Sequence, residues 1–225
     1  MPETPNIYPR MPTDISYISG QLSIIANILT LIVGLFYCYR AHNPSYLRIF
    51  PVYLFGSIAE EFFANSNIFK LFNYKPFGIH QKYAAIASYN LYTPFELFMF
   101  AWFLYQVIQS SRIKRLLIIL LLLFSLLFII YYRSVGVGER LNSISVILES
   151  IILIIPCLTW YQELFARNES INLFGEPAFW LVSGIFFYLA TIIPYLLVSM
   201  NWMNEGLYGK VKILSSINNL SLIIT

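Results

Sequence analysis

The chain has 225 residues, of which 58% are hydrophobic and only 11% are charged. Because soluble globular domains carry about 25% charged residues, this composition excludes the ordinary soluble class and favours an integral membrane protein. The formal net charge is only +3, and the basic residues lie between the apolar runs rather than along a basic stripe. That pattern excludes a nucleic-acid-binding surface and fits membrane topology signals.

The apolar runs predict an all-α, polytopic transmembrane bundle of about seven spans. Residues 1–16 form a tail that is rich in proline, which disfavours a helix there. Residues 17–225 form a single transmembrane helical domain. The expected spans, in chain order, are 17–39, 49–65, 84–108, 116–132, 141–164, 177–200 and 213–225.

The last of these segments is short for a membrane crossing. At about 1.5 Å rise per residue, residues 213–225 reach only about 20 Å, against an apolar bilayer thickness of about 30 Å. The segment is therefore either a partial helix or the start of a span that continues in a longer natural chain. We favour the second interpretation.

The span 84–108 organises the rest because it carries polar groups in its interior, among them Asn90, Thr93 and Glu96. A carboxyl group inside a membrane span costs roughly a few kcal/mol unless it faces protein or water. We therefore expect this helix to lie inside the bundle. The span 116–132 is apolar on all sides, and we expect it to face lipid as scaffold.

Polar side chains of the other spans fall at a similar depth, in the half of the membrane nearer the amino terminus. Buried polar groups must pair with one another or stay hydrated, so convergence on a shared layer satisfies them. This favours a water-accessible pocket, although the same side chains could simply hydrogen-bond the helices together. The residues expected to line the pocket are Glu60, Glu61, Asn90, Thr93, Glu96, Glu149, Tyr188, Asn218 and Asn219.

The sequence predicts no metal site, no cofactor and no catalytic residues. Both histidines, His42 and His80, lie in connections, which argues against an intramembrane zinc site and against a Ser-His-Asp set. Cys38 and Cys157 fall inside spans and are expected to be apolar core residues. We favour a protein that is not an enzyme and leave the enzyme class open.

Three stretches carry a resemblance to a known group of proteins: YNLYTPFELF at 89–98, PAFWLVSGIFFY at 177–188 and INN at 217–219. With them, the chain resembles uncharacterised seven-helix membrane proteins of Bacteroidota-type bacteria. The resemblance covers most of the chain. It implies a helical bundle with a sensory or accessory role, and it implies no activity.

The leading interpretation is a membrane module that binds a small ligand or a membrane-protein partner as a sensor or accessory subunit. A proton-coupled transporter that uses the same carboxyl groups is the alternative, followed by an intramembrane lipid enzyme. The expected partners are the bilayer and that ligand or protein, without nucleic acid. Basic residues close to span ends, in 40–48 and 112–115, favour the inner membrane of a bacterium with the amino terminus outside.

Overall fold

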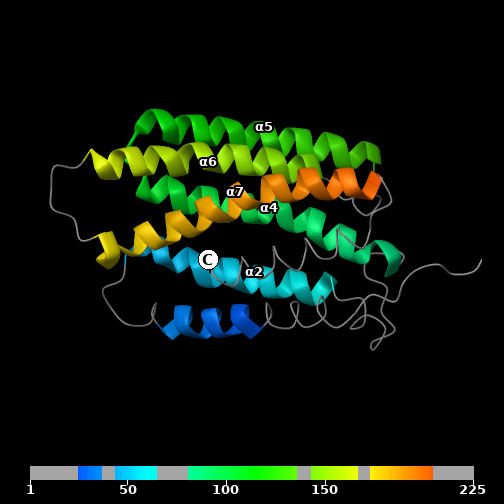
Figure 1. Cartoon of the computed structure of the whole chain (residues 1–225), viewed down its shortest axis with the longest axis horizontal. Helices are drawn as coiled ribbons and strands as arrows, with labels where there is room; N and C mark the ends of the chain where they lie inside the picture. The colour runs from blue at the N-terminus through cyan, green and yellow to red at the C-terminus, as the bar shows by residue number, and fades with distance from the viewer. Residues whose placement is uncertain (1–24, 37–43, 65–80, 136–142, 167–172, 205–225) are drawn as a thin grey trace, which may run out of the picture.

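The structure is a computed structural model that describes residues 25–36, 44–64, 81–135, 143–166 and 173–204. Within these ranges every regular element is a helix and none is a strand (Figure 1). The elements are the helix Ile25–Phe36, η1 (Ser45–Arg48), α2 (Ile49–Ala64), α4 (Gln81–Val107), α5 (Ser111–Val135), α6 (Ser143–Phe165), η3 (Leu173–Gly175) and α7 (Pro177–Asn204).

Helix α4 lies at the centre of the bundle. It packs against α2 on one side and against α6 on the other, and α6 packs in turn against α5 and α7 (Figure 1). Leu97, Ala101, Phe103 and Leu104 of α4 are completely buried. The prediction that the polar span 84–108 lies inside the bundle is confirmed.

Helix α5 lies at the outer edge of the bundle and exposes most of its apolar surface. Of the residues in its most apolar 18-residue stretch, only 11% are buried, compared with 56% in the corresponding stretch of α6. Leu122 and Ile129 are more than half exposed, as expected for side chains that face hydrocarbon. The prediction that residues 116–132 form a peripheral apolar helix is confirmed.

Among the described residues, three helices are long and apolar enough to cross a membrane: Ser111–Ser134, Ser143–Phe165 and Pro177–Val198. They correspond to three of the expected spans and support a membrane protein. Helix α4 has 27 residues, but its polar groups lower its hydropathy. The tail 1–16 and the short segment 213–225 lie outside the described residues.

The turn between α4 and α5 is held by a side chain from α6. Glu163 accepts hydrogen bonds from the backbone N–H groups of Gln109 and Ser110, each at 2.7 Å. These N–H groups precede the first turn of α5, where no helical partner exists for them. A carboxylate at this position also interacts favourably with the helix dipole. One side chain therefore ties the ends of α4, α5 and α6 together.

Proline residues interrupt the helical hydrogen bonding of α4 at Pro94, of α6 at Pro156 and of α7 at Pro194. Each proline lacks an N–H and so leaves a carbonyl one turn earlier without its usual partner. Such interruptions are tolerated in membrane helices when neighbouring helices or side chains satisfy the freed groups. Pro94 lies two residues before Glu96, and the carbonyl that it concerns is that of Asn90.

Candidate functional site

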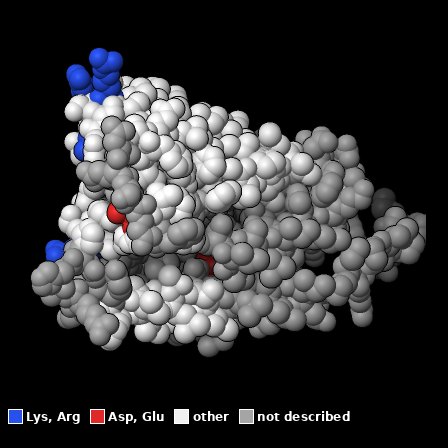
Figure 2. All heavy atoms as spheres, turned by 60° about the vertical axis from the view of Figure 1, so that its left-hand side comes forward, with Lys and Arg blue, Asp and Glu red and all other residues white. Residues whose placement is uncertain are grey.

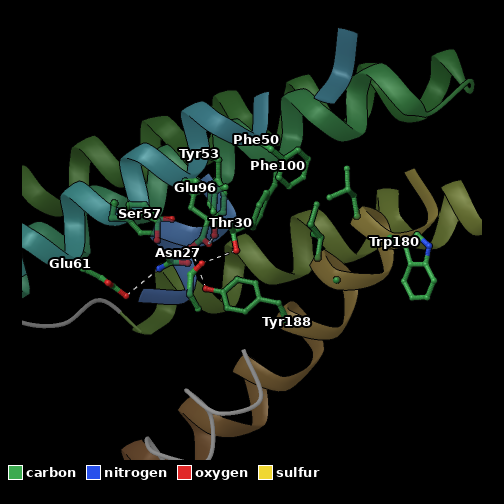
Figure 3. A pocket seen from close by; sticks show the side chains of 16 residues that line it. Asn27, Thr30, Phe50, Tyr53, Ser57, Glu61, Glu96, Phe100, Trp180 and Tyr188 are labelled. Atoms are coloured by element: carbon green, nitrogen blue, oxygen red, sulfur yellow. Dashed lines mark hydrogen bonds between the residues drawn. The ribbon is translucent and has the colours of Figure 1, made fainter. Parts of the chain in front are cut away.

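The described part of the bundle contains a partly open pocket of about 520 Å³. It lies between α2 and α7, over α4, and the helix Ile25–Phe36 borders it as well (Figure 3). Pockets that hold small molecules measure about 300–1,000 Å³, so the volume suits a ligand of modest size. The lining residues are Ala26, Asn27, Thr30, Phe50, Tyr53, Leu54, Ser57, Glu61, Tyr92, Glu96, Phe100, Trp180, Leu181, Gly184, Ile185 and Tyr188.

Helices α2, α4 and α7 each line the pocket with residues spaced four apart. Residues at this spacing lie on the same helix face, one turn above the other. Each helix therefore presents one continuous ridge of side chains to the cavity. The ridges are Tyr53, Ser57 and Glu61 on α2; Tyr92, Glu96 and Phe100 on α4; and Trp180, Gly184 and Tyr188 on α7.

Glu96 is the central polar group of the pocket. Its side chain is only 5% exposed and accepts two hydrogen bonds from tyrosine hydroxyls. Tyr53 of α2 donates to Oε1 at 2.9 Å, and Tyr188 of α7 donates to Oε2 at 3.3 Å (Figure 3). Because a carboxylate offers about four lone-pair positions, these bonds leave room for a further donor. The carboxylate links α2, α4 and α7 at one point.

A second carboxylate lies at another position in the pocket. Glu61 accepts a hydrogen bond from the Asn27 amide Nδ2 at 3.4 Å (Figure 3). This bond connects α2 to the helix Ile25–Phe36. The neighbouring Glu60 is partly buried, lies outside the lining and has Ser88 of α4 within hydrogen-bonding reach. The predicted pair Glu60 and Glu61 is thus divided between two faces of α2.

Aromatic rings surround Glu96. The Tyr53 and Phe100 ring centroids lie 4.7 Å apart, and Phe100 meets Tyr188 edge to face at 6.4 Å. Tyr53 also lies 6.4 Å from Tyr92. Ring contacts of this kind add about 0.5–1.5 kcal/mol to the burial of their area. The hydroxyls that bind the carboxylate therefore belong to rings that pack against other aromatic rings.

Three other predicted pocket residues are buried outside the lining. Asn90 is 1% exposed, and the Thr93 hydroxyl donates to the Tyr89 backbone carbonyl at 3.2 Å. Glu149 of α6 is 2% exposed, and its Oε1 has no hydrogen-bond partner among the described residues. Glu149 lies within electrostatic range of Glu96.

Of the nine predicted pocket residues, the structure brings Glu61, Glu96 and Tyr188 into one pocket. Asn218 and Asn219 lie outside the described residues. In the described ranges, no group of three or more His, Cys, Asp or Glu side chains could hold a metal ion.

Sequence reasoning missed Tyr53, Tyr92, Phe100 and Trp180. The sequence carries one indication of two of them, because Tyr53 lies four residues before Ser57 and Tyr92 lies four residues before Glu96. Aromatic residues are so frequent here, with 17 tyrosines and 19 phenylalanines, that spacing alone selects too many of them.

The chain matches no protein-family model, no curated protein and no solved structure.

Proposed function

We propose that this protein is an integral membrane module that binds a small ligand in the pocket around Glu96. The observation that carries the proposal is the position of this carboxylate. It is almost fully buried, it is held by hydroxyls from two other helices, and it lines a cavity of about 520 Å³. If it served only to join helices, no such volume would be needed beside it.

The same arrangement supports a role as a sensor or accessory subunit. A ligand that donates to Glu96 adds a third partner to a carboxylate that already binds Tyr53 and Tyr188, which come from different helices. Such a ligand favours one arrangement of α2 relative to α7 over another. A difference in affinity between two arrangements is what converts binding into a conformational signal.

We further propose that the chain crosses the membrane about seven times. The 27 residues of α4 extend about 40 Å, more than the apolar thickness of a bilayer. In this proposal α4 and the three apolar helices cross the membrane. The helix α2 and the helix Ile25–Phe36 lie alongside them in the same bundle and account for two further crossings (Figure 1). Residues 213–225 belong to the last crossing in this proposal.

The proposed location is a bacterial inner membrane with the amino terminus outside. Figure 2 shows lysine and arginine side chains along the left edge of the molecule, at one of its ends. Arg48 lies in η1, and Arg112, Lys114 and Arg115 lie in the first turns of α5, whereas Arg133 lies in the last turn of α5, toward the opposite end. Basic residues next to span ends favour the cytoplasmic side.

The test is a ligand screen on the full chain in lipid nanodiscs, read as a rise in the unfolding temperature. The proposal expects at least one small molecule to stabilise the wild type and to lose its effect in Glu96→Gln. Tyr161→Phe is the matched control, because it removes a partly buried hydrogen bond between the Tyr161 and Ser183 hydroxyls, 2.6 Å apart, that lies outside the pocket. A ligand that stabilises wild type and Glu96→Gln equally would contradict the proposal.

One observation favours a second candidate, a proton-coupled carrier. Glu149, with its unsatisfied oxygen among the described residues, and Glu60 are both within electrostatic range of Glu96. Carboxyl groups that interact across helices inside a membrane are typical of proton pathways. A carrier predicts pH-dependent uptake into proteoliposomes that Glu149→Gln or Glu60→Gln abolishes. A binding module predicts no flux in the wild type.

A further inference from the structure

Glu96 contributes a buried carboxylate to the pocket. None of the described residues that line the pocket is lysine, arginine or histidine. Arg48 lies in η1, and Arg112 and Lys114 lie in the first turn of α5, outside the pocket lining. A buried carboxylate is expensive unless a partner compensates its charge, so the site is suited to a positive ligand.

The walls of the pocket favour an organic cation over a metal ion. Hard metal ions prefer six or more oxygen ligands, whereas the surround of Glu96 consists largely of aromatic rings. The rings of Tyr53, Phe100 and Tyr188 lie around the carboxylate. The Phe100 ring centroid lies 4.7 Å from that of Tyr53 and 6.4 Å from that of Tyr188. Aromatic faces attract ammonium groups within about 6 Å of the ring centroid. A carboxylate surrounded by rings is thus complementary to an alkylammonium head.

The pocket also changes in polarity along the bundle. Phe50 on α2, Phe100 on α4 and Trp180 on α7 line it toward the end of the bundle where α2 and α7 begin. Leu181 and Ile185 of α7 add to this apolar part. Ser57, Glu61 and Asn27 line the opposite part (Figure 3). A bound molecule therefore meets a carboxylate in the middle and an apolar chamber on one side.

We propose that the ligand is an amphipathic organic amine, whose ammonium group binds Glu96 while its apolar body lies against Phe50, Phe100 and Trp180. This inference rests on the proposed function and specifies its ligand class. The ammonium donates to a lone pair of Glu96 that Tyr53 and Tyr188 leave open. The rings of Tyr53 and Phe100 flank the charge, and the apolar body displaces water from the chamber.

The test uses three probes of nearly equal size and different charge: 2-(2-naphthyl)ethylamine, 2-(2-naphthyl)ethanol and 2-naphthylacetate. Binding to the full chain in nanodiscs of zwitterionic lipid is measured by the shift in unfolding temperature and by titration calorimetry. The amine is expected to bind about tenfold or more tightly than the alcohol, and the acetate more weakly still. In Glu96→Gln the preference for the amine disappears, whereas Tyr161→Phe retains it.

The comparison of amine with alcohol on wild-type protein needs no variant and stands even if Glu96→Gln fails to fold. Equal binding of amine and alcohol would overturn the amine inference while leaving a ligand pocket in place. Preferred binding of the acetate would overturn the inference in the same way. If no small molecule of any charge binds, the inference and the proposed function both fail.

Discussion

The Tyr53 hydroxyl donates to Glu96 Oε1 at 2.9 Å, across the interface between α2 and α4. The hydrogen bond from Tyr188 to the other carboxylate oxygen is longer, at 3.3 Å. Because shorter charge-assisted hydrogen bonds are the stronger ones, Tyr53 should contribute more than Tyr188 to holding the carboxylate. Glu96 is therefore fastened chiefly to α2 and more loosely to α7.

Replacing Tyr53 by phenylalanine should lower the free energy of unfolding by about 0.5–2 kcal/mol, the range for a hydrogen bond between membrane helices. Tyr188→Phe should cost less because its bond is longer. Unfolding of the nanodisc-embedded protein by heat or denaturant gives the measurement. Tyr105→Phe is the control, because the interaction of Tyr105 is made by its ring, whose centroid lies 4.9 Å from the Lys114 ammonium group. Phenylalanine keeps this ring, so no loss of stability is expected. Equal loss from Tyr105→Phe would show that the hydrogen bonds to Glu96 are not the cause.

The close crossing of α2 and α4 predicts a second effect. A methyl group at Gly56 would overlap the ring of Phe95 on α4. Gly56→Ala should therefore force the two helices apart and destabilise the protein by about 1–3 kcal/mol, the cost of overpacking. Gly34→Ala is the matched control, because nothing lies within 4 Å of the added methyl group. Thermal unfolding that ranks the two variants in the reverse order would contradict this crossing.

The turn between α4 and α5 predicts a third effect. Glu163→Ala leaves the N–H groups of Gln109 and Ser110 without their acceptor and should destabilise the protein by about 1–2 kcal/mol, as loss of a helix cap does. Glu163→Gln keeps one acceptor oxygen and should cost about half as much. Glu176→Gln is the control, because the hydrogen bond that the Glu176 side chain accepts from Tyr46 is long, at 3.5 Å. Calorimetry that finds Glu163→Ala neutral would remove this role.

The proposed orientation predicts which end of the bundle reacts from outside the cell. Cysteines are introduced singly at Ser111 and Ser134, which are exposed at the two ends of α5, in a background with Cys38→Ser. The remaining Cys157 is completely buried and should stay silent. A membrane-impermeant maleimide on intact cells should label the cysteine at 134 and spare the one at 111. Labelling in the reverse pattern would place the amino terminus inside.

The helices could be predicted from the sequence largely because their limits are set by chemistry that acts locally. Pro177 opens α7 at the predicted position, since proline suits a first helical turn. Helix α5 begins at Ser111, before the predicted 116, because Arg112 and Lys114 can continue a helix while their charged ends reach toward water. Hydropathy alone places such a boundary too late.

The pocket could be predicted only in part. Glu96 was identifiable because a carboxyl group in mid-span must face protein or water. Tyr53 and Trp180 were not, since their roles depend on how α2 and α7 are rotated about their axes. Asn90 and Glu149 are as polar as the pocket residues, yet packing turns them away from the lining. Helix rotation is a property of the whole interface and leaves no local signal in the sequence.

The proposed function depends most on an accessible cavity between α2, α4 and α7. The reactivity of cysteines introduced at two serine positions measures this accessibility directly. Ser57 lines the pocket, whereas Ser150 of α6 is completely buried outside it. In the Cys38→Ser background in nanodiscs, we predict that Ser57→Cys reacts with a small methanethiosulfonate reagent and that Ser150→Cys does not. Equal reactivity at both positions, or none at Ser57→Cys, would contradict it.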